Sequence, residues 1–304
     1  MSSQHELSQA NAFADVLENR INGFWNEDYF TKVILPLLNL KAGGKVLDVG
    51  AGNGALTLLL ARHCPDVHFT GVDITSRLVE DAKQLSQKLG IQNVEFMEGD
   101  ALQLPLEDES FDATVCQTVL MHLPDPAKAV SEMSRVLRQG GTFMAAEYHM
   151  LNYDKPVESG SPINALEEEV SISRYIQILI HGYRALGQGD LKMGGRVPFL
   201  AREAGLKIVD IRINDRVTHA FPPYQRLSEQ MSLTELQGWE ALIKDPSYRS
   251  WLSGMMIAGG GTEADADALL RLLPSHSAEV FNGKDDFAFV WLPNPVLLVT
   301  IARK

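Results

Sequence analysis

The sequence predicts an α/β fold in which helices cover both faces of a doubly wound, mostly parallel sheet. Two observations favour this fold. Short apolar runs alternate with helical patterns about every thirty residues, and the loop from each run to the next helix is short. Apolar residues make up 45% and charged residues 22% of the 304 residues, which is typical of a globular protein with one large domain or two.

The alternation is clearest in the first half of the chain. Residues 1–40 carry apolar side chains at helical spacing and are predicted to be mostly helical. Five strands are then expected at residues 45–49, 67–73, 93–101, 110–119 and 142–148. The helix after the second strand is expected to stop at Gly90. The helix after the fourth strand is expected to begin at Asp125-Pro126 and to end at Gly140-Gly141.

Helical patterns dominate the second half. We expect a long helix over residues 163–186, a shorter helix over 196–204 and a sixth strand over 206–215. Two further helices are expected to begin at Asp245-Pro246 and at Thr262, and a last strand to span residues 295–304. The chain is predicted to divide into a helical cap (residues 1–40) and a core (41–150). A helical insertion with the sixth strand (151–215) and a helical insertion with the final strand (216–304) follow. The insertions are expected to form a lid over the strand ends and to offer a surface for a homodimer.

Composition and charge disfavour several classes of partner. The net charge is −12, and no run rich in Lys or Arg offers a surface to nucleic acid. The N-terminal residues lack the pattern of a secretory signal, and no apolar stretch is long enough to cross a bilayer. Cys64 and Cys116 are too few for a disulfide framework or, alone, a zinc site. We expect a cytoplasmic protein without a membrane partner and with both cysteines buried.

A glycine turn follows the first strand, in the stretch VLDVGAGNG at residues 46–54. Gly50 and Gly52 allow the backbone to approach a ligand closely, and the helix that follows directs its N–H groups at negative charge. The spacing Gly50-x-Gly52-x-x-Ala55 also satisfies a loose form of the dinucleotide fingerprint. The turn therefore predicts a nucleotide-type ligand without identifying it.

Three acidic residues lie at strand ends, where an open parallel sheet binds ligands. Asp48, inside the apolar first strand, either attracts a cationic amino group or holds loop amides, and both interpretations stay open. Asp73, 23 residues after Gly50, fits an acceptor for ribose hydroxyls, the alternative being a helix N-cap. Asp100 fits an acceptor for an adenine amino group with Ala101 against the ring, the alternative being an exposed turn acid.

The motifs VLDVGAGNG, GVD, EGDA and FDATVCQTVLMHLPDPAKAVSEMSRVLRQGGTF follow one another in this order. In this order and spacing the chain resembles class I S-adenosylmethionine-dependent methyltransferases, in the style of the ubiquinone and menaquinone branch (type 11), over roughly residues 40–150. The resemblance implies a Rossmann-like sheet of seven strands with an antiparallel last strand. It also implies S-adenosylmethionine as the cofactor and methyl transfer to a small organic acceptor.

The resemblance implies roles for single residues as well. Asp48 would lie near the methionine amino group of the cofactor, Asp73 on its ribose and Asp100 on its adenine. Gln117 would face the methionine end, and Tyr29 would close over that end from the N-terminal segment. The remaining cofactor contacts expected around these residues are Gly50, Ala51, Gly52, Ile74 and Ala101.

Methyl transfer from a sulfonium depends on in-line positioning, and a base is needed only when the acceptor must lose a proton. His122, just past the fourth strand, and His149, just after the fifth, are the candidate bases, the alternative for each being packing against cofactor or loop. Glu147 and Tyr148 are expected at the same rim. Two other classes of function stay open: a non-catalytic S-adenosylmethionine-binding sensor or scaffold, and a nicotinamide-dependent oxidoreductase, which Asp48 and Asp100 disfavour.

Overall fold

The computed structural model describes residues 24–150, 157–158, 166–215, 217–220, 223, 229–230, 233–234, 242, 244–272, 289–291 and 296–304. The chain divides into two compact units. We call the first the sheet unit; it comprises the described part of Met1–His149 together with Lys192–Asp215 and Leu297–Lys304. We call the second the helical unit; it comprises the described parts of Met150–Leu191 and Arg216–Val296.

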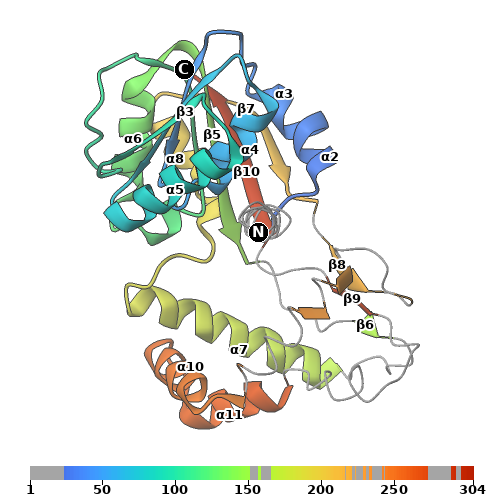
Figure 1. Cartoon of the computed structure of the whole chain (residues 1–304). Coiled ribbons are helices and arrows are strands. Elements are labelled where there is room, and N and C mark those ends of the chain that lie inside the picture. Colours follow the sequence, from blue (N-terminus) through green and yellow to red (C-terminus); the bar gives the residue numbers. More distant parts are fainter. Residues whose placement is uncertain are drawn as a thin grey trace. The chain divides into compact units, whose positions relative to one another are not determined.

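The sheet unit is built on seven strands in the order β3-β2-β1-β4-β5-β10-β7 (Figure 1). Their bounds, in chain order, are β1 (Lys45–Val49), β2 (His68–Asp73), β3 (Val94–Glu98), β4 (Phe111–Gln117), β5 (Leu137–His149), β7 (Lys207–Ile213) and β10 (Val296–Arg303). Strands β1 to β5 pair in parallel, and β10 pairs with β7 antiparallel. The sequence-based prediction of a seven-stranded, mostly parallel sheet with an antiparallel last strand is confirmed.

Helices lie on both sides of this sheet (Figure 1). On one side, α4 (Ala55–His63) and α5 (Ser76–Leu89) pack in one buried cluster with alternate strand residues such as Val46 and Val115. On the other side, α6 (Pro126–Val136) contacts β4, β5 and α8 (Val197–Glu203). Residues that alternate along a strand point to opposite faces, so both faces of β1 and β4 are buried. The strand order reverses between β1 and β4, which places a crevice at their C-terminal ends.

Residues 1–23 of the predicted helical segment lie outside the described part of the chain. The described segment that precedes β1 is mostly helical. It consists of α2 (Glu27–Tyr29), the π-helical turn η1 (Phe30–Ile34) and α3 (Leu35–Leu37). Phe30 and Ile34 are fully buried in the same cluster as α4 and α5. Trp25, just before α2, is 2% exposed and packs edge-on against Phe30, with 5.3 Å between ring centroids.

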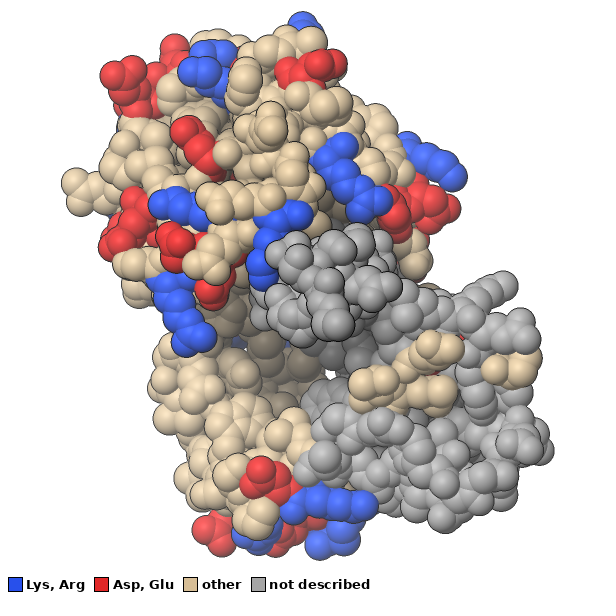
Figure 2. All heavy atoms as spheres, in the orientation of Figure 1, with Lys and Arg blue, Asp and Glu red and all other residues tan. Residues whose placement is uncertain are grey.

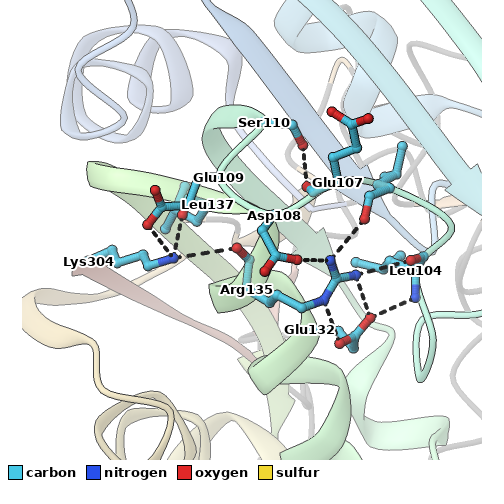
Figure 3. Close-up of polar contacts among 10 residues, drawn as sticks. Leu104, Glu107, Asp108, Glu109, Ser110, Glu132, Arg135, Leu137 and Lys304 are labelled. Carbon is cyan, nitrogen blue, oxygen red and sulfur yellow. Dashed lines mark hydrogen bonds and ion pairs between the residues drawn. The ribbon is translucent and has the colours of Figure 1, made fainter.

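The opposite end of the sheet from the crevice is held by charged side chains (Figure 3). Arg135 of α6 donates hydrogen bonds to Glu132, to Asp108 and to the carbonyl oxygens of Leu104 and Leu106. These contacts hold the loop that leads into β4 against α6. Similar contacts at the start of β1 join Asp112 to the Lys45 N–H at 2.8 Å and to Arg138 at 2.8 Å.

The helical unit contains α7 (Leu166–Ala185), α10 (Pro246–Ala258) and α11 (Glu263–Leu272). Helix α7 contacts both others. At this contact, a Cβ atom on Gly182 would overlap the carbonyl oxygen of Met255, and one on Gly259 would overlap that of Ile178. Glycine therefore allows the helix backbones to approach closely. The unit also holds a small antiparallel sheet in the order β6-β9-β8, namely β6 (Val157–Glu158), β9 (Phe289–Trp291) and β8 (Thr218–Ala220).

Several expectations from the sequence are corrected by the structure. The small sheet was not expected. Helix α6 ends at Val136 rather than at Gly140-Gly141, because Leu137 already pairs with Phe111 and the glycines lie inside β5. The third strand ends at Glu98, because the chain turns at Gly99 and Asp100. Cys116 is buried as expected, whereas Cys64 is partly exposed. Among the described residues, no helix combines the length and apolarity that a bilayer crossing requires.

Candidate functional site

A cavity of about 190 Å³ lies at the C-terminal ends of β1 and β4. The residues that line it come from the segment before α2, the turn after β1, the helices α4 and α5 and the end of β4. They are Phe24, Trp25, Asp48, Gly50, Ala51, Gly52, Asn53, Ala55, Leu56, Leu59, Leu78, Gln117 and Thr118. The cavity therefore lies where the reversal of strand order places a ligand crevice.

The glycine loop (Gly50–Gly54) forms one side of this cavity. Gly50, Gly52 and Gly54 all have positive φ, of 70°, 56° and 83°, a backbone region that glycine adopts at little cost. The N–H groups of Gly50 and Ala51 donate to the Val72 carbonyl at 2.7 and 2.9 Å, which fixes the loop on the end of β2. A Cβ atom on Gly52 would project into open space. The loop thus presents bare backbone to whatever fills the cavity.

Asp48 is 2% exposed and lies beneath the loop. Its Oδ2 atom accepts a hydrogen bond from the Thr57 hydroxyl in the first turn of α4 at 2.6 Å. Burial raises the pKa of Asp48 to about 7, against the opposing effect of the Thr57 hydrogen bonds. One interpretation open from the sequence is an acid that holds loop amides; the partner that the structure shows is instead Thr57, in α4. The carboxylate also lines the cavity, so the second interpretation remains a proposal.

Asp73, at the end of β2, lies across the loop from Asp48. Its two carboxylate oxygens accept hydrogen bonds from the N–H groups of Gly52 and Thr75, each at 2.9 Å. Thr75 is the N-cap residue of α5, so Asp73 supports the start of that helix from two residues before it. A carboxylate has about four acceptor positions, and these two bonds leave capacity for further donors.

Three further residues that the sequence predicts as cofactor contacts, Ile74, Asp100 and Ala101, are not among those that line the cavity. Ile74 is 67% exposed. Asp100 is exposed, and its Oδ1 atom accepts a hydrogen bond from the Leu102 N–H at 2.8 Å in a turn. Ala101 beside it is nearly buried, with 9% exposure. Asp100 is a turn acid, which is the alternative named from the sequence, and a role in binding remains a proposal.

Gln117 lines the cavity at the end of β4, and its partner was not expected. Its side-chain oxygen accepts a hydrogen bond from the indole N–H of Trp25 at 2.8 Å. Phe24, the neighbour of Trp25, contacts Tyr148 of β5 with ring centroids 6.1 Å apart. The aromatic side chains that reach the cavity from the N-terminal segment are therefore Phe24 and Trp25.

Tyr29 is placed elsewhere. It is absent from the cavity lining, and its hydroxyl donates to the carbonyl oxygen of Ile213 at 2.9 Å. The structure thus gives Tyr29 a contact with the end of β7, and the role of covering the cavity passes to residues four and five positions earlier. The adjacent aromatic pair Phe-Trp in the sequence was the signal that could have identified them.

Neither candidate base lines the cavity. His122 is exposed in the short 3₁₀ helix η2 (Leu120–His122). His149 packs on η3 (Met193–Gly195), where its Nδ1 atom accepts a hydrogen bond from the Gly195 N–H at 3.1 Å. A Cβ atom on Gly195 would lie 2.7 Å from the imidazole, so glycine is required there. Because the lone pair of Nδ1 is used, the neutral ring carries its proton on Nε2.

Glu147 differs from its expected place at the rim. Its side chain is fully buried, and its oxygens accept hydrogen bonds from the N–H groups of Val119, Leu120 and Met121 at 2.8, 2.9 and 3.3 Å. Burial raises the pKa of Glu147 to about 7, although these hydrogen bonds act in the opposite direction. The buried thiol of Cys116 lies 3.9 Å from the same carboxylate.

The comparison with known families gives this geometry a context. Residues 40–182 match the family model described as a methyltransferase domain. Over these residues the chain is similar to methyltransferase domains. The match confirms the resemblance to class I S-adenosylmethionine-dependent methyltransferases that the motifs indicate, and S-adenosylmethionine is the cofactor of that class.

Curated relatives support the same assignment over part of the chain. The uncharacterized methyltransferase YcgJ of Bacillus subtilis is 38% identical over 117 residues, which are 38% of this chain and 46% of the relative. The 27-O-demethylrifamycin SV methyltransferase of Amycolatopsis mediterranei is 33% identical over 45% of this chain and 56% of the relative. The demethylmenaquinone methyltransferase of Staphylococcus aureus is 33% identical over 42% of this chain and 53% of the relative. The chain thus spans about half the length of the curated relatives that it matches.

Solved structures share the fold over most of the chain. The YcgJ structure from Bacillus subtilis covers 91% of this chain and 98% of its own, with a TM-score of 0.50 and 19% identity. The structure of the [4+2]-cyclase SpnF covers 98% of this chain and 95% of its own, with a TM-score of 0.53 and 20% identity. A cyclase with this fold illustrates that the fold alone does not fix the reaction.

Proposed function

We propose that the protein is a methyltransferase that transfers the methyl group of S-adenosylmethionine to a small organic acceptor. The observation that carries the proposal is the bare glycine loop between two carboxylates, Asp48 and Asp73, inside a methyltransferase domain. A pyrophosphate would be repelled by the buried acid beside the loop, whereas a cationic amino group would be attracted once Asp48 is ionised.

The dimensions of the cavity suggest how such a cofactor would lie. A cavity of about 190 Å³ is smaller than the roughly 300–1,000 Å³ of sites that enclose a whole ligand of this size. The methionine end would therefore occupy the cavity beside Asp48 and Gln117. The adenosine end would cross the glycine loop toward Asp73, Ile74 and Asp100, which do not line the cavity.

The chemistry asks little of the protein beyond positioning. When bound, the cofactor supplies an electrophilic methyl group on a sulfonium, whose departure needs no protonation. The chain would contribute alignment of the acceptor with that methyl group and exclusion of water. If the acceptor must lose a proton, His122 is the better candidate for the base, because the Nδ1 lone pair of His149 already holds Gly195.

Charge and relatives support a small acceptor. On the face drawn in Figure 2, the described Lys and Arg residues lie interspersed with Asp and Glu over the sheet unit, rather than gathered in the basic patch that a nucleic acid would require. The rifamycin and menaquinone relatives are named for methylation of small molecules. We extend that class of acceptor to this chain, and leave the methylated atom to experiment.

The deciding experiment is calorimetric titration of S-adenosylmethionine, S-adenosylhomocysteine and NADH into the full chain and into Asp73→Ala. We expect the first two to bind, and the substitution to weaken their binding roughly tenfold to a hundredfold, because hydrogen bonds to a charged acceptor are lost. Asp81→Ala is the matched control, since this acid is exposed on α5, lies outside the cavity lining and pairs with Arg77 at 4.0 Å. Binding of NADH alone would overturn the proposal. Binding of S-adenosylmethionine without methyl transfer to any acceptor screened would favour a sensor or scaffold.

A further inference from the structure

We infer that Glu147 is a positioning residue of the cofactor site: it holds the turn after β4 (Thr118–Met121) in the shape that closes the cavity opposite the glycine loop. The inference rests on the proposed function and adds a residue that does not itself line the cavity. It follows from three observations on Glu147, on the turn and on Gly50.

The first observation is the set of donors around Glu147. Three consecutive backbone N–H groups, from Val119 to Met121, point at one carboxylate that belongs to a different strand, β5. The bonds from the Leu120 and Met121 N–H groups are buried and the bond from Val119 is partly buried, so at least two of the three donors lie away from water. The side chain of Glu147 is thus the acceptor on which the turn depends.

The second observation is the strained backbone at the start of the turn. Thr118 has a φ of 53°, in the left-handed region that β-branched residues rarely adopt. Its N–H donates to the Ala146 carbonyl at 2.9 Å, next to Glu147. Such a conformation persists only where surrounding contacts determine it. The hydrogen bonds from the three following N–H groups to Glu147 are the contacts that do so.

The third observation connects the turn to the glycine loop. Gln117 and Thr118 line the cavity directly. The side chain of Val119 packs so closely on Gly50 that a Cβ atom there would overlap it. A change in the turn would therefore move both the lining at the end of β4 and the support of the loop after β1. Glu147 acts on the cofactor through these groups, without touching it.

The charge environment of Glu147 is simple. The groups that face it are the three N–H groups, the Cys116 thiol on β4 and, more distantly through Cys116, Asp48 on β1. No cation among the described residues pairs with it in a salt bridge. Its role is therefore that of a hydrogen-bond acceptor, which an amide oxygen can partly replace.

The test compares Glu147→Gln and Glu147→Met with the wild-type chain, using the Kd of S-adenosylhomocysteine from calorimetry and Tm from thermal unfolding. Glu147→Met leaves the three N–H donors without an acceptor, and we expect the Kd of S-adenosylhomocysteine for this variant to rise about tenfold or more. Gln retains one acceptor oxygen and should restore much of that affinity. If Glu147→Met fails to fold, the comparison of Gln with the wild type decides, with a Kd increase of a few-fold expected.

Asp112→Asn is the matched control. Asp112 also accepts a backbone N–H, from Lys45, but at the other end of β4. We expect this substitution to lower Tm and to leave Kd unchanged. If the Glu147 variants likewise lower Tm while Kd stays at the wild-type value, the inference is overturned and Glu147 is only structural. If the wild-type chain binds no S-adenosylhomocysteine, the proposed function fails, and the inference with it.

Discussion

At the scale of the residue, Asp48 joins stability to binding. Burial raises its pKa to about 7 from an ordinary value of 3.8, so between roughly pH 4 and 7 the folded chain keeps a proton that the unfolded chain has lost. The contribution of Asp48 to the free energy of unfolding therefore falls as pH rises through this window. Asparagine does not titrate there.

We therefore expect the Tm of Asp48→Asn, relative to the wild-type chain, to rise between about pH 5 and pH 8. At the higher pH the variant should also bind S-adenosylmethionine more weakly, because the negative charge is absent. Thermal unfolding at several pH values and calorimetry at the higher one are the measurements. A Tm difference that does not change with pH would contradict the shifted pKa.

The sequence identified part of the cavity at this scale. Asp48, Gly50, Ala51, Gly52 and Gln117 all line it. These residues were predictable because the strand–glycine–helix pattern places them locally, within a few residues of one another or at the end of a buried strand. Trp25 and Glu147 depend on partners in other parts of the chain, Gln117 lying 92 residues from Trp25. No local pattern reports such contacts.

At the scale of the element, the segment before α2 is tied to the end of β7. We call residues Phe24–Asn26 the N-terminal strap. The Asn214 side chain donates to the Phe24 carbonyl at 2.9 Å and accepts the Leu297 N–H at 2.9 Å. The Asn26 side chain donates to Asp215 at 2.9 Å. Since Phe24 and Trp25 line the cavity, we expect the strap to cover a cofactor bound there.

Removal of this connection should loosen the cover. We expect Asn214→Ala to speed dissociation of S-adenosylhomocysteine several-fold, because its hydrogen bond to the Phe24 carbonyl of the strap is lost, together with the Leu297 bond that orients the side chain. Stopped-flow displacement measures the rate. Asn93→Ala is the control: the Asn93 side chain also bridges backbone carbonyls, those of Ala61, Cys64 and Val67, away from the cavity. It should lower Tm without changing the rate. Equal rates in Asn214→Ala and the wild type would contradict a covering role.

Helices and strands whose apolar residues recur with a clear period were predictable from the sequence, and elements without such a period were not. The five parallel strands and the helices between them follow from apolar runs, caps and glycine stops, as at Gly90, which ends α5 with a φ of 67°. The strands β6, β8 and β9 are two or three residues long, too short for alternation to emerge. The end of α6 was missed because tertiary pairing of Leu137 with Phe111 overrides the helix-stop preference of Gly140-Gly141.

At the scale of the whole molecule, the cavity belongs entirely to the sheet unit, whereas Gly182 lies in the helical unit. Gly182→Ala would place a methyl group on the Met255 carbonyl, and we expect it to force α7 and α10 apart and to lower the unfolding temperature. The Kd of S-adenosylhomocysteine should remain within a few-fold of the wild type.

Calorimetric unfolding and ligand titration measure both effects. Gly254→Ala in α10 is the matched control, since a Cβ atom there meets nothing within 4 Å and alanine favours the helix. It should keep or raise Tm. A large loss of affinity in Gly182→Ala would show that the cofactor site depends on the integrity of the helical unit.

The two cysteines differ in a way that matters for handling the protein. Cys116, a residue of β4, is buried beside Glu147 of β5, and burial raises the pKa of its thiol well above the ordinary value. Cys64 is partly exposed at the C-terminal end of α4, whereas the cavity lies at the N-terminal end of that helix. Burial raises the pKa of the Cys64 thiol as well, but Cys64 is the more accessible of the two, so we expect a maleimide dye at mildly alkaline pH to attach to Cys64 in preference to Cys116. The wild-type chain thus offers a preferred labelling position for fluorescence work that leaves the cofactor cavity open.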